Sequence, residues 1–289
     1  MIVINYNVVS STQYIALKIA ESINNFDINQ ENYNIYQILD FIISLHNTDN
    51  FHLENDNFID ISISKSFTSG NSLIIAVIAK EQNNGIGRLD RKWVSQEGNF
   101  FCTLIIKHNL LESKNIKISL LPYYIALSCF YAINNFITNA SNTIKIKWPN
   151  DILVNHNKIC GILIQSIKNT FLIGIGINIF NKPDITDTQI IYPATCLHDF
   201  CNINKNFLDK IISELLNLII TNFLSLIDNN FNEIKKIYIS NSFKFNDIIT
   251  IKTKDNNTIT GIFKSISNTG EMQIINNNNT INISFGDVS

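Results

Sequence analysis

Clustered and alternating apolar positions divide the N-terminal part of the chain into short strands and helices. Residues 1–9 and 72–82 are runs rich in Val and Ile, and each run predicts a strand. Between them, the segment SSTQ precedes residues with helical spacing, which predicts a helix with Ser11 or Thr12 as its N-cap. Residues 22–72 are Asn-rich and poorly periodic around YQILDFIISLH. We expect this segment to be an irregular insertion with space for one helix.

The middle of the chain continues the same alternation of strands and helices. NFFCTLIIK predicts a strand over 99–107, and residues 120–137 have helical periodicity. Three further segments predict strands, of which the second is a hairpin that turns near 155–158: residues 143–150, 151–167 and 170–179. A turn-rich stretch follows, and residues 207–239 predict one or two amphipathic helices.

The last fifty residues have a different character. The short runs DIITIKT, TITGIFKSI, EMQII and TINISF are separated by the turn sequences KDNN, SNTG and NNNN. This pattern is typical of a small β-barrel or sandwich. We therefore place a domain boundary near residue 240, with 1–239 (including the insertion at 22–72) as one domain and 240–289 as the other. Periodicity alone predicts an α+β fold with a small all-β tail.

Composition narrows the class of protein. The chain has 289 residues, 45% of them hydrophobic and 16% charged, which is typical of a globular protein. Its net charge of −2 gives no overall attraction to nucleic acid or to an acidic membrane, so any anion site must be local. The five cysteines are an odd number without a CxxC spacing, which favours a reducing cytoplasm over disulfides or a metal clip. We find no signal peptide and no apolar run long enough to span a membrane.

The loop sequence QNNGIGRLDRKWVS combines flexibility with local positive charge. Gly85 and Gly87 allow unusual backbone conformations, and the cations after them suit a phosphate or carboxylate. The cations are Arg88, Arg91 and Lys92, and the aromatic residue Trp93 follows them as an anchor. An ordinary solvated turn is the alternative, and the loop is neither a dinucleotide-binding fingerprint nor a P-loop.

Two further segments carry candidate chemistry. In KIKWPNDILVNHNKICGIL, Asn150 and Asp151 lie where a strand meets a turn, and Lys158 leads into an apolar strand. That lysine either faces an anion or extends its ammonium from the sheet edge to water, and its spacing does not decide between them. GIGIN at 174–178 indicates close approach of the backbone by packing or by a ligand.

Together, these motifs resemble the biotin protein ligases, also called biotin–[acetyl-CoA-carboxylase] ligases. The family pattern runs from an STN-like segment through Q..GxGR.xRKW.S..G, KWPND, GKxxGIL and GxGxN to a small β-domain. Here the segments are STQ from Ser11, GIGRLDRKWVS from Gly85, KWPND from Lys147, NKICGIL from Asn157 and GIGIN from Gly174. The resemblance covers most of the chain outside 22–72.

The resemblance implies a fold and an activity. The fold would be a mixed, mostly antiparallel sheet with helices, like the class II synthetase core, followed by an SH3-like β-barrel. Such proteins join biotin to ATP, in the presence of Mg²⁺, and form biotinyl-5′-AMP and pyrophosphate. They then transfer the biotinyl group to one lysine of a biotin carboxyl carrier domain. Because the Ser/Thr segment begins near residue 10, we expect no N-terminal helix-turn-helix and no DNA binding. The near-neutral charge and the lack of a long apolar run predict no membrane partner, whereas a homodimer stays open.

The resemblance also implies roles for individual residues. Three cations would stabilise the charges that meet during biotin activation: Arg88, Arg91 and Lys158. Biotin would be bound by Ser11, Thr12, Gln13, Gln82, Ile86, Gly87, Arg88, Lys158, Gly161, Gly174 and Gly176. ATP would be bound by Arg88, Arg91, Lys92, Trp93, Asn150, Asp151 and Asn178, with Asp151 also a candidate metal ligand.

The chain departs from the family pattern at several positions. Ile86 stands in place of an arginine, Asp90 in place of a glycine, Gln13 in place of the usual asparagine, and Gln165 in place of a common glutamate. We expect these departures to affect the rate rather than the identity of the reaction.

Two alternative functions stay open. A lipoate–protein ligase or octanoyl transferase would share the fold, although no RRxSGGG-like stretch occurs. A non-catalytic binding module would use the C-terminal β-domain as its interaction surface.

Overall fold

The structure is a computed structural model that describes residues 1–25, 35–46, 58–63, 73–183, 192–253 and 257–288. In these ranges, one sheet has the strand order β2-β1-β3-β4-β8-β7-β6-β5, and a second has the order β12-β11-β10-β9-β13. β1 and β3 pair in parallel. The pairs β1–β2, β3–β4, β4–β8, β5–β6 and β6–β7 are antiparallel. The predicted α+β class with a mostly antiparallel main sheet is confirmed.

The chain forms two compact units, which are residues 1–110 with 162–177 and residues 111–161 with 178–289. The second unit contains the C-terminal strands, so it includes residues on both sides of the predicted boundary near 240. That boundary stays a prediction. No helix in the described part of the chain has the length and hydrophobicity needed to cross a bilayer.

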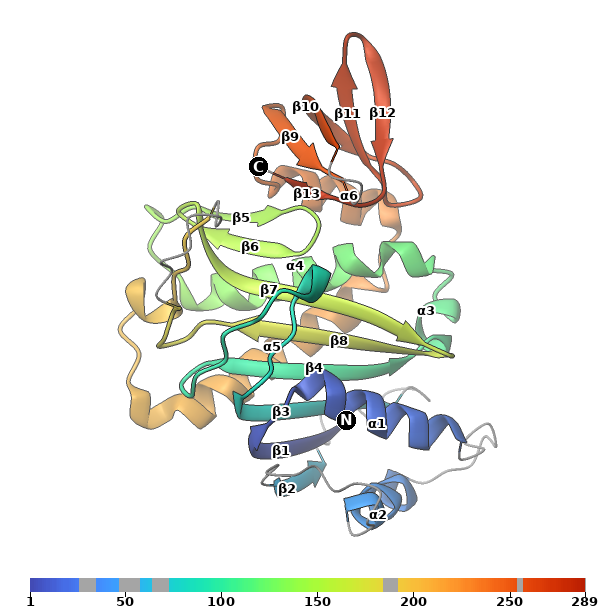
Figure 1. Cartoon of the computed structure of the whole chain (residues 1–289), viewed down its shortest axis with the longest axis vertical. Helices are drawn as coiled ribbons and strands as arrows, with labels where there is room; N and C mark the ends of the chain where they lie inside the picture. The colour runs from blue at the N-terminus through green and yellow to red at the C-terminus, as the bar shows by residue number, and fades with distance from the viewer. Residues whose placement is uncertain (26–34, 47–57, 64–72, 184–191, 254–256, 289) are drawn as a thin grey trace. The chain divides into compact units, whose positions relative to one another are not determined.

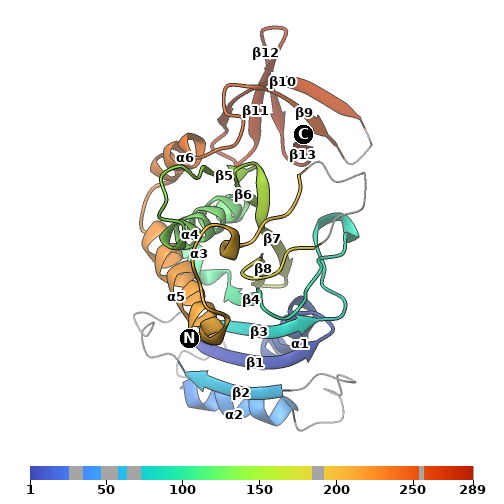
Figure 2. The ribbon, with the colours of Figure 1, turned by 90° about the vertical axis from the view of Figure 1, so that its left-hand side faces the viewer.

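The first unit is built from strands and helices whose apolar residues face one another. Its elements are β1 (Ile2–Val9), α1 (Thr12–Asn25), α2 (Ile35–His46), β2 (Phe58–Ile63), β3 (Ile74–Gln82), β4 (Phe100–Lys107), β8 (Thr170–Ile177) and the last part of β7 (Asn157–Ile167). β1, β3 and β4 run side by side in Figures 1 and 2.

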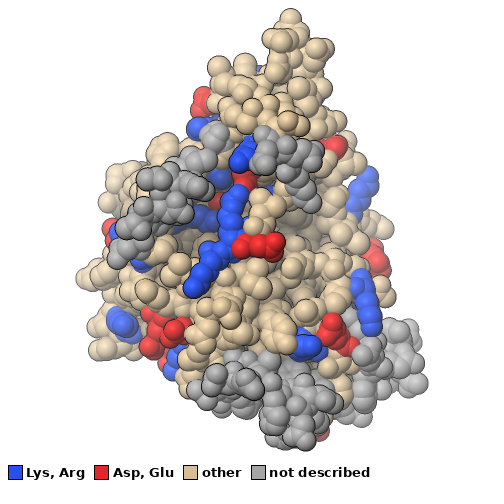
Figure 3. Space-filling view, in the orientation of Figure 1, with Lys and Arg blue, Asp and Glu red and all other residues tan. Residues whose placement is uncertain are grey.

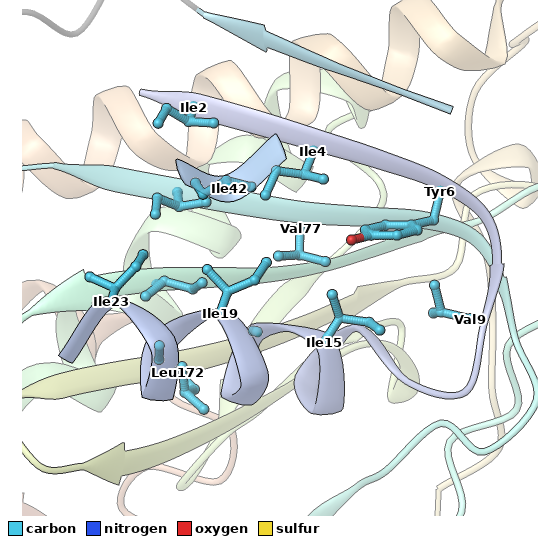
Figure 4. Close-up of a cluster of buried hydrophobic side chains, with 14 of the residues drawn as sticks. Ile2, Ile4, Tyr6, Val9, Ile15, Ile19, Ile23, Ile42, Val77 and Leu172 are labelled. Carbon is cyan, nitrogen blue, oxygen red and sulfur yellow. The ribbon is translucent and has the colours of Figure 1, made fainter. Parts of the chain in front are cut away.

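Helix α1 covers this part of the sheet because its apolar residues recur with helical spacing. Ile15, Ile19 and Ile23 lie on one face of α1 and are buried. Figure 4 shows them pointing toward Ile4 of β1 and Val77 of β3, with α2 at the same cluster. The cluster fixes where α1 begins, and the N-terminus of α1 is where the candidate residues Ser11, Thr12 and Gln13 lie.

The segment 22–72 corrects the prediction of an irregular insertion with space for one helix. α1 extends to Asn25, α2 is the expected helix, and β2 is an additional strand. β2 pairs antiparallel with β1 from Ile2↔Ile63 to Tyr6↔Phe58 and forms the edge of the sheet. The six residues of β2 are too few for a clear periodic signal, and pairing with β1 supplies the missing stabilisation. Residues 26–34, 47–57 and 64–72 of this segment lie outside the described residues.

The second unit surrounds one buried helix, α4 (Leu121–Phe136), which packs against α5 (Leu208–Leu226), α6 (Phe231–Ser240) and the hairpin of β5 (Ile144–Lys147) and β6 (Asp151–Val154). The hairpin between β6 and β7 turns at Asn155 and His156, as predicted, and both residues have a left-handed φ. Short α3 (Asn109–Glu112) joins the two units along the chain. The outer edge of β5 is covered by the chain after α6. The Ile146 amide donates to the Asn241 carbonyl (2.8 Å), and the Phe243 amide donates to the Ile146 carbonyl (2.8 Å).

The C-terminal sheet consists of β9 (Ile248–Lys252), β10 (Thr258–Ile266), β11 (Met272–Asn276), β12 (Asn279–Ile283) and β13 (Asp287–Val288). The pairs β9–β10, β10–β11, β11–β12 and β9–β13 are antiparallel. Figure 1 shows β11 and β12 as a long hairpin. The predicted all-β tail is confirmed, while its SH3-like topology stays a prediction.

Candidate functional site

A connected group of neutral polar side chains lies at the N-terminus of α1 in the first unit. We call it the Thr12 cluster: Thr12, Gln13, Gln82, Ser95, Thr103 and Gln165. The Thr12 amide and hydroxyl both donate to Gln82 Oε1, at 2.7 and 3.1 Å. The Thr103 hydroxyl lies 2.9 Å from Thr12 Oγ1 and 3.1 Å from Gln13 Oε1, and donates toward both.

The outer members of the Thr12 cluster fix the two glutamines. Gln13 Nε2 donates to Gln165 Oε1 (2.9 Å) and to the Leu172 carbonyl (3.3 Å). Gln82 Nε2 donates to Ser95 Oγ (2.8 Å). Thr12, Gln13 and Thr103 are at most 5% exposed. The cluster therefore presents oriented hydrogen-bonding groups without net charge, which suits a neutral polar ligand group.

Ser11 has the structural role that its position predicted. Its hydroxyl accepts a hydrogen bond from the Gln13 amide (3.2 Å), and its carbonyl accepts one from the Ile15 amide (3.1 Å). These bonds satisfy donors of the first turn of α1. The predicted contact between Ser11 and biotin stays a prediction.

The loop at 83–95 is a small hairpin in the structure. Gly87 and Arg91 are joined by a hydrogen bond from the Gly87 amide to the Arg91 carbonyl (2.7 Å). The Trp93 amide donates to the Gly85 carbonyl (2.8 Å), and Ile86 bridges Lys92. Arg88 is half-buried, whereas Arg91, Lys92 and the Ile86 side chain are exposed.

The backbone angles of this hairpin show where its unusual conformations lie. Neither Gly85 nor Gly87 has a left-handed φ, and Gly87 is extended at φ −111°. Leu89 and Asp90 instead have a φ of 56° each. Asp90 stands where the family has glycine, and aspartate tolerates this region better than most residues. Gly85 is needed for close packing, because a Cβ there would lie 2.4 Å from the Trp93 carbonyl oxygen.

Glycines in β8 make space for two side chains of the same unit. A Cβ at Gly176 would lie 2.5 Å from Trp93 Cε2, so the indole rests directly on the backbone of β8. A Cβ at Gly174 would lie 2.8 Å from Gln13 Oε1. Close approach explains both glycines, as the packing interpretation of GIGIN predicted.

A charged group lies on one face of the β5–β6–β7 segment in the second unit. Asp151 faces Lys147 across the β5–β6 pair and Gly161 across the β6–β7 pair, while Leu153 faces Lys158. Because directly paired residues project to the same face, these side chains share one surface. The Asp151 carboxylate lies 2.8 Å from Lys158 Nζ and 3.8 Å from Lys147 Nζ.

This arrangement decides between the two interpretations of Lys158. Its ammonium faces an anion, and that anion is the Asp151 carboxylate of the same chain. The aspartate side chain is 13% exposed and the Lys158 side chain 29%. An ion pair this sheltered gives the ammonium a fixed direction. Lys147 is buried, and its ammonium lies 4.9 Å from the centre of the Tyr192 ring.

The neighbouring segment 193–199 is hydrogen-bonded to Lys158 of β7 and to Asn178, all within the second unit. The Lys158 amide donates to the Pro193 carbonyl (2.7 Å), and the Thr195 amide donates to the Lys158 carbonyl (2.9 Å). Asn178 Nδ2 donates to the Thr195 carbonyl (2.9 Å), so this predicted ATP-binding residue also has a structural role. Asn150 lies half-buried in the turn before Asp151.

Electrostatics around this segment are dominated by hydrogen bonds to Asp199. Partial burial raises the pKa of this carboxyl, but hydrogen bonds from Lys182, Thr195 and the Cys196 amide outweigh it and hold the pKa below its ordinary value. Burial raises the pKa of the Cys160 thiol well above its usual range, which keeps the thiol neutral.

On the face drawn in Figure 3, basic and acidic side chains are interspersed, in keeping with the net charge of −2.

Among the described residues, no group of three or more His, Cys, Asp or Glu side chains is arranged to hold a metal. The Asp151 carboxylate is already balanced by two ammonium groups, which weakens its attraction for a cation. The predicted metal-ligand role of Asp151 therefore lacks support from its surroundings and stays a prediction.

The predicted site residues thus form two groups, one in each unit. The first group comprises Ser11, Thr12, Gln13, Gln82, Ile86, Gly87, Arg88, Arg91, Lys92, Trp93, Gly174 and Gly176. The second comprises Asn150, Asp151, Lys158, Gly161 and Asn178. Sequence reasoning missed Thr103, Lys147 and Tyr192. A single Thr inside the apolar run FFCTLIIK was the only available signal for Thr103.

Comparisons with known proteins show which proteins this chain is similar to. The family model described as "Biotin/lipoate A/B protein ligase family" matches residues 65–179. The chain is 34% identical over 113 residues to a biotin–[acetyl-CoA-carboxylase] ligase of Paracoccus denitrificans, which covers 37% of this chain and 45% of that protein. It is 22% identical over 222 residues to the corresponding ligase of Mycobacterium tuberculosis, covering 74% of this chain and 78% of that protein. The first of these alignments thus spans less than half the length of the relative.

Solved structures with a similar fold are also biotin protein ligases. A biotin protein ligase of Aquifex aeolicus, solved in complex with biotin and ATP, superposes with a TM-score of 0.65 at 21% identity over 99% of this chain and 97% of that one. This likeness establishes the fold. The resemblance to biotin protein ligases, which the sequence motifs indicated, is confirmed by the family model, the curated relatives and the structural neighbour.

Proposed function

We propose that the chain is a biotin–[acetyl-CoA-carboxylase] ligase, which activates biotin with ATP and transfers it to a lysine of a biotin carboxyl carrier domain. The family match, the curated relatives and the solved relative that holds biotin and ATP support this function. The cytoplasm is the compartment we propose for it.

The Thr12 cluster is the observation that carries the choice of biotin. Biotin ends in a ureido ring with N–H donors and a carbonyl acceptor, whereas lipoyl and octanoyl chains end without hydrogen-bonding groups. Buried hydroxyls and amides in fixed orientations can form hydrogen bonds with the ureido ring, but they form none with the end of a lipoyl or octanoyl chain. We assign Thr12, Gln13 and Gln82 to the ureido ring. Ser11, Gly174 and Gly176 shape the surroundings of the same ring.

The chemistry requires positive charge where two anions meet. A carboxylate oxygen of biotin attacks the α-phosphorus of ATP, a new P–O bond forms, and the bond to the β-phosphate oxygen breaks to release pyrophosphate. Lys158, oriented by Asp151, is the ammonium we assign to the biotin carboxylate, with Gly161 leaving space beside it. Arg88 and Arg91 are assigned to the phosphates. Each well-placed donor of this kind contributes about 3 kcal/mol to the transition state in comparable enzymes.

Transfer completes the reaction. The ε-amine of the carrier lysine attacks the acyl carbon of biotinyl-5′-AMP, the bond to the AMP oxygen breaks, and the lysine loses a proton as the amide forms. Main-chain groups at Ile86 and Gly87 and the indole of Trp93 are assigned to cover the adenylate, since exclusion of water protects it from hydrolysis. Lys92, Asn150, Asp151 and Asn178 are assigned to the nucleotide. Mg²⁺ on the ATP phosphates would supply further neutralisation of charge.

The test is a transfer assay read by mass spectrometry. The protein is incubated with ATP, Mg²⁺ and a biotin carboxyl carrier domain, together with biotin, lipoate or octanoate in separate reactions. We expect a mass increase of one biotinyl group on the carrier and biotin-dependent release of pyrophosphate. Transfer of lipoate or octanoate instead would show that the acyl specificity is wrong. Absence of pyrophosphate release in every reaction would favour a binding module without catalysis.

A further inference from the structure

The C-terminal sheet is fastened to helix α4 within the second unit at one turn. This turn lies between β10 and β11 and is held by a hydrogen bond from the Ser119 hydroxyl to the Thr269 carbonyl (2.8 Å). Gly270 has a φ of +91°, and a Cβ there would lie 2.9 Å from the Ser119 carbonyl oxygen and 3.3 Å from the ring of Tyr123. The turn therefore packs tightly on the beginning of α4.

Tyr123 connects this turn to the WPND segment. Its hydroxyl donates to the Gly270 carbonyl (2.5 Å) and accepts a hydrogen bond from Trp148 Nε1 (3.1 Å). Tyr123 is 3% exposed and Trp148 is 4% exposed, so both bonds are shielded from water. The Tyr123 ring is also fixed by edge contacts with Tyr238 (4.7 Å) and Phe231 (5.6 Å). Burial raises the pKa of the Tyr123 hydroxyl above its usual range, which keeps its proton in place.

Trp148 lies in the chain between the two oppositely charged residues of the β5–β6 hairpin, Lys147 and Asp151, and Asp151 in turn pairs with Lys158. It follows Lys147 directly and precedes Asp151 by three positions. Trp148 is the first residue of the turn that follows β5, and its indole is buried. A displaced indole would therefore displace the backbone that carries Lys147 and Asp151.

We propose that Tyr123 is a positioning residue for the proposed ligase reaction, through which docking of the C-terminal sheet sets the position of the WPND turn and so of the Asp151–Lys158 pair. The inference rests on the proposed function. It assigns to the C-terminal sheet a role in catalysis that does not require the sheet to touch a substrate. The Thr12 cluster belongs to the other unit and shares no residue with this connection, so recognition of the ureido ring should be insensitive to it, whereas Lys158, which we assign to the biotin carboxylate, should be affected.

The matched variants are Tyr123→Phe and Tyr124→Phe. Tyr123→Phe keeps the ring and removes both hydrogen bonds, whereas Tyr124 is the next residue of the same helix and its hydroxyl makes only a long contact with the Asn229 carbonyl (3.5 Å). We expect Tyr123→Phe to lower kcat/KM for ATP about fivefold to tenfold, as loss of a buried hydrogen bond predicts, and to weaken the binding of biotin. The Kd for biotinamide, which keeps the ureido ring and lacks the carboxylate, should stay within about twofold of wild type. Tyr124→Phe should match wild type in all of these measurements.

Two further measurements separate positioning from a general loss of stability. The chain contains two tryptophans, so a ¹⁵N spectrum shows two indole N–H signals, and Tyr123→Phe should shift one of them at a temperature where the variant is fully folded. A cycle with Trp148→Phe should be non-additive, the double variant being little worse than either single one. If wild type biotinylates the carrier and Tyr123→Phe has the same kcat/KM for ATP, the inference is wrong and the proposed function stands. If wild type itself neither releases pyrophosphate nor transfers biotin, the proposed function is wrong.

Discussion

Thr103 offers the most direct test of the Thr12 cluster, because it is fully buried and its hydroxyl lies at the centre of the cluster. Thr103→Val keeps the shape of the side chain and removes the one hydroxyl that donates toward Thr12 and Gln13. Loss of a donor to buried acceptors costs about 1–3 kcal/mol. If about 1.4 kcal/mol of this is expressed in ligand binding, the Kd for biotin rises about tenfold.

The control is Thr103→Ser, which keeps the hydroxyl and loses one methyl group. The lost methyl should lower the free energy of unfolding by about 1 kcal/mol without changing the cluster. The two variants should therefore both be less stable than wild type, but only the valine variant should bind biotin weakly. Calorimetric titration with biotin in the absence of ATP measures the affinity, and chemical denaturation measures the stability. Equal affinity of the valine and serine variants for biotin would refute the assignment of this cluster to the ureido ring.

Two further predictions concern the loop at 83–95, and a third concerns Asp199 in the second unit. Gly176→Ala should push the Trp93 indole off β8, lower the free energy of unfolding by about 1–3 kcal/mol through overpacking, and change the tryptophan fluorescence; an unchanged emission spectrum would contradict the contact. Asp90 has a left-handed φ, so Asp90→Gly should leave trypsin cleavage of the loop unchanged, whereas Asp90→Val should strain the backbone by about 1–2 kcal/mol and accelerate cleavage. Asp199 has a lowered folded-state pKa, so the stability it contributes is present above the pKa of its unfolded state, about 3.9, and is lost as the pH falls through the folded value. Denaturation of wild type and Asp199→Asn from pH 6 to pH 3 should show their difference shrinking at the acid end, and a constant difference would show that the bond to Lys182 and its neighbours does not favour the ionised form.

Local patterns predicted most of the fold. Strands β1, β3, β4 and β8 follow from runs of β-branched and aromatic residues, and helices α1 and α4 follow from helical spacing. β2 was missed because a six-residue strand at a sheet edge depends on its partner, β1, more than on its own sequence. Pairing partners separated by more than fifty residues carry no signal in a single sequence.

The site was predictable where motifs are contiguous and unpredictable where the fold brings residues together. The GR loop, WPND and GIGIN were found as motifs, but the contact between Gly176 and Trp93 joins two of them across eighty residues. Glycine in a loop can serve an unusual φ or close packing, and the sequence does not distinguish the two reasons; in the structure Gly85 is explained by close packing. Thr103, Lys147 and Tyr192 became visible as site residues only through tertiary contacts.

The Asp151 carboxylate lies beside Lys158, the ammonium that we assign to an anionic ligand group. A site that must attract an anion would gain attraction from Lys158 if no carboxylate stood beside it. An unpaired ammonium, however, adopts many rotamers. Pairing with Asp151 orients Lys158, and the nearby Lys147 leaves two ammonium groups against one carboxylate, a net charge of +1. The arrangement therefore retains attraction for an incoming carboxylate while fixing the direction of the donor. Asp151→Asn should accordingly raise the affinity for simple anions and still lower the rate of adenylate formation, because the loss of orientation outweighs the gain in charge.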